Sequence, residues 1–332
     1  MPVRLEELPS STAYFYEPSS RTHVYILGTF HVSQASTEDV RQCLRLLRPR
    51  VVCLELCLDR FLCMFDSSPS KTKEERGGSI MNKSIADLFI SSVYAILQRA
   101  GMESGGEFVA AVQEAKALGC SVVLGDINAT DTFDELSKLV SITEMFDIPS
   151  ALRGIRGFAS SFTPSAGGRV DFLQVFSDSR RILELVPFSA AIFLSSSILT
   201  TIAWYAESAA GVSQASHESV DDLIVSIPLI VIFALIPRIH PVLIESRDKF
   251  LLKSILECCS LRKQLPDTRE QLRNNTVLAI VGLLHVNGML RMASSETALD
   301  EASYHAVWLN DQVSGASRRP GASAHLQEQP DT

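Results

Sequence analysis

Short apolar runs alternate with longer amphipathic stretches along this chain. The runs 23–28, 50–55, 120–125 and 276–281 are almost continuously apolar and are bounded by Gly, Pro or polar residues. Such runs are typical of strands that are buried on both faces of a parallel sheet. The run 303–309 is a fifth strand candidate. The pattern therefore predicts an α/β fold with a mostly parallel sheet flanked by helices.

The stretches between these runs have apolar residues at helical spacing. Residues 36–48 begin with an acidic turn, continue with a helical repeat and end at Pro49. Residues 85–99, 107–118 and 242–261 show the same 3.6-residue periodicity. Each of these stretches is predicted to be a helix, because an apolar stripe at that spacing can face the sheet.

One segment accounts for the positive mean hydropathy of +0.16. Leu185–Ala206 contains 22 residues without a charge, and Leu223–Pro237 contains 15 more. The connector between them carries acidic residues and no Lys or Arg, whereas Arg residues stand on both outer sides. A bilayer span needs about 20 apolar residues, and basic flanks favour the cytosolic side. The segment 185–238 is therefore predicted to be a membrane helical hairpin.

The alternative for this segment is a pair of buried or interfacial helices, because the first run holds six Ser/Thr residues and the second is short. A hairpin crosses a membrane twice, so the flanking residues stay on one side. Residues 1–184 and 239–311 are accordingly predicted to form two parts of one domain. Residues 312–332 are polar and are predicted to be a disordered tail.

Charge and cysteine content narrow the possible partners and compartments. The net charge of −8 argues against a nucleic-acid-binding protein. The seven cysteines lack paired zinc-finger spacing and are expected to be free thiols in a reducing compartment. The first 18 residues lack the features of a signal or transit peptide. We therefore expect a membrane protein whose domain faces the cytosol, with the mitochondrial outer membrane and endoplasmic reticulum as candidate surfaces.

Four polar residues follow the predicted strands closely: His31, Glu55, Asp126 and His285. Ligands of open α/β sheets bind at the carboxyl ends of the strands, so these side chains are candidates to converge. Imidazole and carboxylate groups suit a divalent transition metal, which could activate a water molecule. Structural readings remain open as well: Asp126 could cap a helix, Glu55 could pair with Arg60, and each histidine could simply be hydrogen-bonded.

The order of several motifs resembles the TraB/PrgY/GumN family, which includes the Tiki proteins. The motifs are ILGTFHVS at 26–33, PRVVCLELCLDR at 49–60, GGE at 105–107, VLGD at 123–126, ESRD at 245–248 and IVGLLHVNG at 280–288. They span residues 24–292 outside the apolar segment.

This resemblance implies an α/β domain akin to the erythromycin-esterase and ChaN-like group, with the apolar hairpin as an insertion. Tiki members are described as divalent-metal-dependent proteases. By resemblance, His31, Glu55 and His285 are the metal ligands, with Mn, Co or Zn as the metal. Glu55, Glu107 and Asp126 are the implied catalytic residues. Arg60, Arg247 and Asp248 are the implied substrate-binding residues.

The chain departs from the family pattern at two places. Ile127 and Asn128 stand where the family usually has Arg–Asp, and Glu135 stands where it has an Arg. These changes remove two guanidinium groups that could bind a carboxylate or phosphate in bidentate fashion. Two functions are therefore predicted side by side: a membrane-anchored, divalent-metal-dependent hydrolase acting on a peptide or protein, or a non-catalytic binding or regulatory module at a membrane surface.

Overall fold

A computed structural model shows a six-stranded sheet with the strand order β1-β2-β5-β3-β4-β6. It describes residues 3–31, 33–65, 105–128, 148–162, 170–184, 194, 201, 240–260, 275–294 and 307–309. The strands are β1 Thr12–Glu17, β2 Thr22–Thr29, β3 Val51–Leu54, β4 Ser121–Leu124, β5 Thr276–Gly282 and β6 Val307–Leu309.

The four inner strands β2, β5, β3 and β4 are parallel, while β1 and β6 pair antiparallel at the two edges. The predicted α/β class with a mostly parallel sheet is thus confirmed. Strand β5 lies between β2 and β3, so residues from both sides of the apolar segment build one sheet. Strand β1 was not predicted, because it is a half-exposed edge strand rather than a continuous apolar run.

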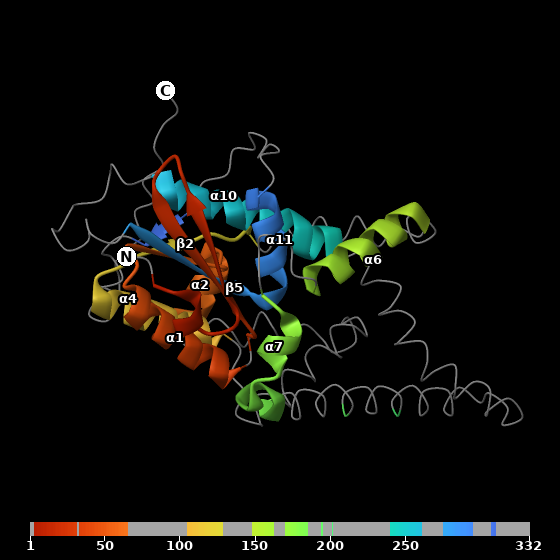
Figure 1. Cartoon of the computed structure of the whole chain (residues 1–332), viewed down its shortest axis with the longest axis horizontal. Coiled ribbons are helices and arrows are strands. Elements are labelled where there is room, and N and C mark those ends of the chain that lie inside the picture. The colour runs from red at the N-terminus through yellow and green to blue at the C-terminus, as the bar shows by residue number, and fades with distance from the viewer. Residues whose placement is uncertain are drawn as a thin grey trace, which may run out of the picture.

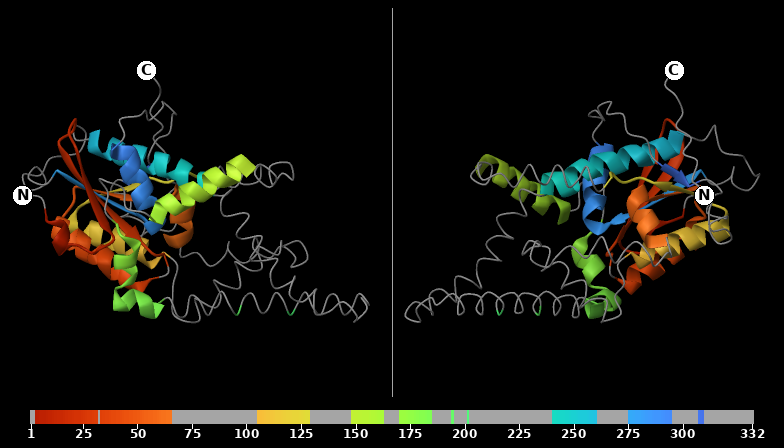
Figure 2. Two further views of the ribbon diagram at one scale, coloured as in Figure 1. Left: turned by 45° about the vertical axis from the view of Figure 1, so that its right-hand side comes forward. Right: turned by 180° about the vertical axis from the view of Figure 1, so that it is seen from behind.

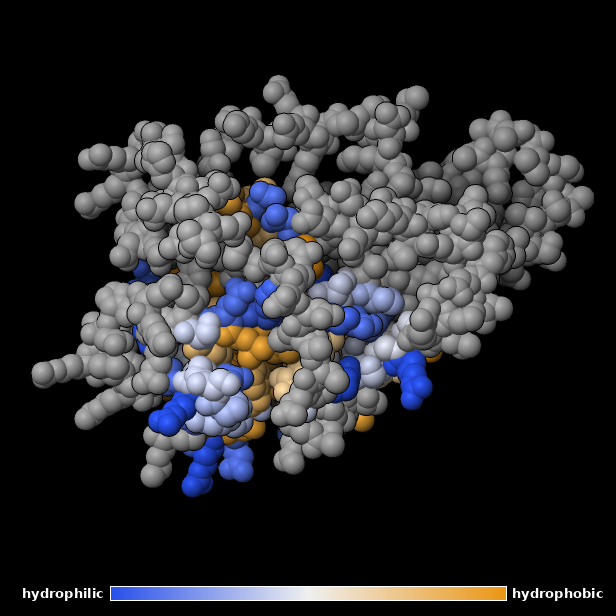
Figure 3. Space-filling view, turned by 90° about the horizontal axis from the view of Figure 1, so that it is seen from above, coloured by the Kyte–Doolittle hydropathy of each residue, from blue (hydrophilic) through white to orange (hydrophobic). Residues whose placement is uncertain are grey.

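The sheet divides the interior into two hydrophobic clusters. Alternate residues of β5 point to opposite faces, with Val277 and Ala279 in one cluster and Leu278 and Ile280 in the other. All seven residues of this central strand are buried, which explains why its sequence is apolar after Thr276. On the face seen in Figure 3, apolar surface lies in the middle of the described residues, with hydrophilic side chains around it.

Helices cover both faces of the sheet (Figures 1 and 2). Helices α1 Gln34–Leu47, α2 Leu58–Phe65 and α4 Gly106–Leu118 contribute to one cluster. Helices α7 Phe172–Phe176, α10 Arg247–Ser260 and α11 Leu283–Ser294 contribute to the other. Helix α6 Ile148–Phe162 contacts α11 and extends away from the sheet. The chain also forms a 3-10 turn η1, Leu5–Glu7, and a π-helical turn η6, Pro241–Ser246, directly before α10.

The helix boundaries differ from the sequence predictions in detail. Helix α1 begins at Gln34, two residues before the predicted start, because the hydroxyl of Ser33 accepts a hydrogen bond from the backbone N–H of Ser36. It ends at Leu47, where Arg48 adopts a left-handed conformation with φ 41° immediately before Pro49. The predicted helix over 242–261 is π-helical in its first turn and α-helical from Arg247 to Ser260.

Several predictions concern residues outside those that the structure describes. They are the helix 85–99, the tail 312–332 and the hairpin 185–238, of which the structure describes Leu194 and Thr201 alone. Within the described part of the chain, no helix is both long enough and apolar enough to span a bilayer. All seven cysteines are free thiols, as expected.

Candidate functional site

The carboxyl ends of β2, β3 and β5 bring three predicted residues around one point. A Cβ atom placed on Gly282 would lie 3.1 Å from His31 Nε2, 3.3 Å from Glu55 Oε2 and 3.4 Å from His285 Cδ2. His31 follows β2 and Glu55 follows β3, as predicted. His285 lies in the first turn of α11, because β5 ends at Gly282 and the helix begins at the next residue. The absence of a side chain at position 282 is what leaves room for this convergence.

Glu55 lies at the centre of the site and is 2% exposed. One oxygen, Oε1, accepts a hydrogen bond from Arg247 Nη2 and lies 3.3 Å from His285 Nε2. The other, Oε2, accepts a hydrogen bond of 2.5 Å from the backbone N–H of Gly282. Burial alone would raise the pKa of Glu55, but the charges of His285 and Arg247 outweigh it and hold that pKa well below its usual value. Glu55 is therefore an ionised acceptor.

Arg247 links Glu55 to a second buried carboxylate. Its Nε and Nη2 atoms donate to the two oxygens of Asp126 over 3.0 and 2.7 Å, in the bidentate geometry that suits a guanidinium. Burial would lower the pKa of Arg247, but Glu55 and Asp126 together raise it. Arg60, on α2, donates to Asp126 over 3.3 Å and keeps 42% of its side chain exposed. Arg60 is thus the cation of this group that faces solvent most.

Each histidine is oriented by a buried carboxyl group. Nδ1 of His31 lies 2.7 Å from Oε1 of Glu107, which is 1% exposed, and Nδ1 of His285 lies 2.6 Å from Oδ1 of Asp248. Because the carboxyl groups are the acceptors, both Nδ1 atoms donate. Nε2 of His31 then faces Gly282, and Nε2 of His285 faces Glu55. The two histidines differ in access, since 36% of the His31 side chain is exposed against 4% for His285.

The same partners shift the protonation of both imidazoles. Burial would lower the pKa of His285, but the charge of Glu55 and the hydrogen bond to Asp248 raise it to about 10. Burial likewise would lower the pKa of His31, but the hydrogen bond that its Nδ1 donates to Glu107, together with the charges of Glu55 and Glu107, outweighs burial, so this pKa is also raised. Burial raises the pKa of Asp248 to about 6, against the lowering effect of His285.

All eight predicted residues thus lie in one neighbourhood: His31, Glu55, Arg60, Glu107, Asp126, Arg247, Asp248 and His285. The convergence does not test the metal, catalytic and substrate-binding roles assigned to them. Two glycines of the quoted motifs, Gly288 and Gly125, lie beside the site. At Gly288 a Cβ atom would overlap Asp248, and at Gly125 it would lie 2.6 Å from Cys53 Sγ. Gly288 thus lets Asp248 of α10 approach α11, and Gly125, whose Cβ would also lie 3.2 Å from Ser254 Cβ of α10, lets α10 approach the end of β4.

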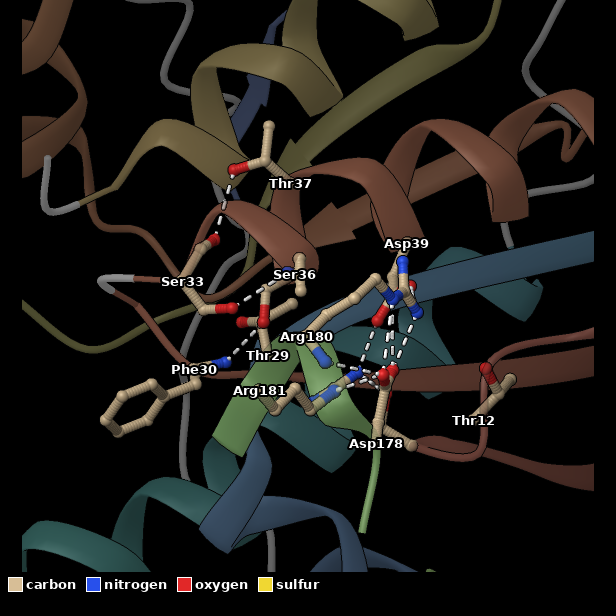
Figure 4. Close-up of polar contacts among 12 residues, drawn as sticks. Thr12, Thr29, Phe30, Ser33, Ser36, Thr37, Asp39, Asp178, Arg180 and Arg181 are labelled. Atoms are coloured by element: carbon tan, nitrogen blue, oxygen red, sulfur yellow. Dashed lines mark hydrogen bonds and ion pairs between the residues drawn. The ribbon is translucent and has the colours of Figure 1, made fainter. Parts of the chain in front are cut away.

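An ion cluster that sequence reasoning missed lies beside the His31 loop (Figure 4). Asp39 of α1 is 1% exposed and pairs with Arg181 and, over 3.4 Å, with Arg180. Glu184 accepts a hydrogen bond of 3.0 Å from the backbone N–H of Ala35, in the first turn of α1. Residues 178–184 are therefore docked on the start of α1, directly before the predicted apolar hairpin. The adjacent Arg180 and Arg181 were the available sequence signal, but their partner lies more than 140 residues away.

The donor set supports a metal ion in some respects and opposes it in others. Histidine ligands of metals commonly donate Nδ1–H to a carboxylate, as both histidines do here, and Oε2 of Glu107 is buried without a hydrogen-bond partner among the described residues. Against this, both oxygens of Glu55 already accept hydrogen bonds, and the Arg247 guanidinium would repel a cation. Among the described residues, no group of three or more His, Cys, Asp or Glu side chains is arranged to hold a metal ion. The side chains as placed do not fit the predicted metal.

Comparison with known proteins places the motifs in context. No protein-family model matches the chain. A curated human protein named TraB domain-containing protein is 33% identical over 125 residues, which cover 34% of this chain. The match spans 33% of the human protein, about a third of its length. It confirms, over about a third of the chain, the resemblance to the TraB family that the ordered motifs predict.

Proposed function

We propose that this site is the centre of a hydrolase, in which the His31–Glu107 pair transfers the proton during attack of water on a carbonyl group. One observation carries the proposal: an imidazole oriented by a buried carboxyl presents Nε2 at the point where three strand ends meet. This arrangement of an imidazole and a carboxyl is the one that general bases of hydrolases use. The exposed third of the His31 side chain gives water and substrate access.

In the proposed reaction, His31 Nε2 accepts a proton from a water molecule whose oxygen attacks the carbonyl carbon. The same imidazolium then donates that proton to the leaving nitrogen or oxygen as the carbon–heteroatom bond breaks. Glu107 holds the tautomer and stabilises the imidazolium, so it is a positioning residue. The partly exposed guanidinium of Arg60 is available to stabilise negative charge on the substrate. Glu55 and Arg247 position the surrounding groups, since their donors and acceptors are engaged with one another.

The proposed substrate is a peptide or protein, as expected from the resemblance. A divalent cation held by His31, Glu55 and His285 is the alternative form of the same proposal. It requires the proton of His285 and the contact between Arg247 and Glu55 to give way, because a metal ligand must present a lone pair. Metal analysis of the purified protein distinguishes the two forms.

Attachment to a membrane through residues 185–238 is also part of the proposal. Its support is the uncharged length of 185–206 and the docking of residues 178–184 on α1, which would hold the domain close to the start of the anchor. Carbonate extraction of cell membranes tests it. Retention of the full chain in the membrane pellet supports an integral anchor, and release into the supernatant contradicts one.

The decisive experiment compares His31→Asn with His23→Asn in the full chain. His23 lies on β2 and pairs with Tyr14, away from the site, so it is a matched control. Quenched fluorescent peptides and nitrophenyl esters serve as substrates, with chelator or with added Mn, Co or Zn. We expect turnover to fall about 10²- to 10⁴-fold in His31→Asn, the usual contribution of a general acid–base group, and to persist in His23→Asn.

A folded wild-type protein without turnover in any of these conditions would contradict the hydrolase proposal. If such a protein still binds peptides, and binding survives the His31 substitution, the second predicted function follows: a non-catalytic binding module.

A further inference from the structure

A cavity of ≈ 200 Å³ lies between α6, η6 and α11, next to the candidate site. Its polar lining comprises Ser160, Ser161, His240, Glu245, Asp248 and Arg291. Pockets for drug-sized ligands measure about 300–1,000 Å³, so the occupant of this one must be smaller. The cavity shares Asp248 with the candidate site, and none of its other lining residues takes part in the proposed hydrolysis.

Arg291 of α11 places a cation on the wall of this cavity. The side chain is partly buried, and it donates from Nη1 to the backbone oxygen of Ser160 over 2.6 Å and from Nη2 to the Ser160 hydroxyl over 3.1 Å. These two contacts tie Arg291 to the last turn of α6. Within the described part of the chain, no carboxylate forms an ion pair with Arg291. A guanidinium has five N–H donors, so several remain for an anionic ligand.

Asp248 places a carboxylate oxygen on the wall of the same cavity. Its Oδ1 atom accepts the hydrogen bond from His285, whereas Oδ2 has no hydrogen-bond partner among the described residues. Gly288, which also lines the cavity, leaves room for Oδ2, since a Cβ atom there would overlap it. The side chain of Asp248 is 3% exposed, so this oxygen is well shielded from bulk solvent.

The remaining buried groups of the lining add dipoles rather than charge. The Ser161 hydroxyl lies 3.1 Å from His240 Nε2, and both residues are buried. Burial lowers the pKa of His240, which therefore is neutral at pH 7. Glu245 is exposed and pairs with Lys249 over 3.5 Å. Among the described residues, the lining thus has two carboxylates, the buried Asp248 and the exposed Glu245, and one cation, Arg291, which forms an ion pair with neither.

We propose that this cavity binds a small zwitterion such as a free amino acid, with its carboxylate on Arg291 and its ammonium group on Asp248 Oδ2. A simple anion would meet the guanidinium but leave the carboxylate oxygen unmatched, and a simple cation would do the reverse. A zwitterion satisfies both, and the cavity volume suits a molecule of that size. Binding does not depend on hydrolysis at the neighbouring site, although the ligand would contact the carboxyl that orients His285.

Isothermal titration of the full chain with glycine, acetate and methylammonium tests the proposal. These probes carry both charges, the negative charge alone and the positive charge alone. We expect glycine to bind at least about tenfold more tightly than either single ion, because each charged hydrogen bond contributes separately. Equal affinities of the three probes would mean that the cavity does not recognise both charges together, and no binding of glycine would mean that it holds water alone. Either result would overturn the proposal.

Two arginine variants locate the binding. Arg291→Gln should weaken glycine binding at least about tenfold, whereas Arg156→Gln, at an exposed position on α6, should leave it unchanged. Glycine binding that Arg291→Gln does not affect places the ligand elsewhere and contradicts the proposal. Thermal unfolding checks that Arg291→Gln is folded, and the comparison of the three probes on the wild-type chain needs no variant.

Discussion

Replacing Arg247 by Met should destabilise the fold strongly, and more at neutral than at acidic pH. The Met side chain keeps most of the aliphatic stem and removes the guanidinium. In the native structure that guanidinium contacts Glu55 and Asp126, whose side chains are 2% and 3% exposed, while Arg247 itself is 16% exposed. The substitution therefore leaves two buried carboxylates without their shared counter-ion.

The expected loss of stability depends on the partners that Glu55 and Asp126 keep in the variant. Removing one partner of a buried ion pair costs about 3–5 kcal/mol. Here Asp126 keeps Arg60, and Glu55 keeps His285 and the N–H of Gly282, so the lower end, about 3 kcal/mol, is expected. For a domain of this size, 1 kcal/mol corresponds to roughly 2–4 °C, so the melting temperature should fall by roughly 6–12 °C.

The pH dependence identifies the cause. The depressed pKa of Glu55 contributes stability that is present above the unfolded pKa of about 4.3 and is lost as the pH falls below it. Arg247→Met reduces that depression. The difference in unfolding free energy between wild type and variant should accordingly be constant from pH 6 to 7.5 and shrink below about pH 4.3.

Urea unfolding at several pH values, with Arg45→Met as the control, measures this difference. Arg45 pairs with Glu114 on the surface, with 59% of its side chain exposed, so its loss should change stability little. A loss below about 1 kcal/mol for Arg247→Met, or a loss that persists undiminished at pH 3, would refute the reasoning.

Three further predictions follow from the same contacts. Gly282→Ala should lower turnover in the peptide assay, because its Cβ would lie 3.1–3.4 Å from His31, Glu55 and His285 and would displace them by a few tenths of an ångström. Gly106→Ala, whose Cβ would lie 3.5 Å from Thr37 Oγ1, should keep the wild-type turnover. The raised pKa of His285 contributes stability that is complete below the unfolded value of about 6.5 and is lost as the pH rises toward about 10. The unfolding free energy should therefore decline from pH 6.5 to 8, and less steeply in His285→Gln. Asp39→Asn should cost about 3 kcal/mol in urea unfolding, because the buried Arg181 loses its close ion pair and keeps the longer contact of 4.0 Å with Asp178, while Glu38→Gln, at a side chain that is 57% exposed, should have little effect.

The positions of the four inner strands could be predicted because each run is apolar on both faces. In β5, for example, Leu278 and Ala279 belong to different clusters, yet both are fully buried. A sequence of that kind fits only a strand covered on both sides. The edge strand β1 carries no such signal, because its later residues are partly exposed and its pairing with β2 depends on backbone hydrogen bonds.

The sequence predicted which residues belong to the candidate site, but not which of them form hydrogen bonds and ion pairs with one another. His31, Glu55 and Asp126 were expected together because parallel strands end at one edge. The sequence could not show that Glu107 orients His31 and that Asp248 orients His285. These hydrogen-bonded pairs join residues 76 and 37 positions apart on separate elements. The contact between Arg247 and Glu55, across 192 positions, changes the expected chemistry most, because it occupies the carboxylate assigned to a metal.

The sequence by itself determined the α/β class, the parallel inner strands and the sheet edge at which polar residues gather. Hydrophobic periodicity and the direction of parallel strands are local or topological properties, so they can be read along the chain. The tertiary structure alone decided which carboxyl orients each imidazole, where Gly282 leaves room, and that Arg291 and Asp248 face one cavity. Hydrogen bonds and ion pairs act over about 3 Å, and only the packing of α4, α10 and α11 on the sheet brings these side chains to that distance.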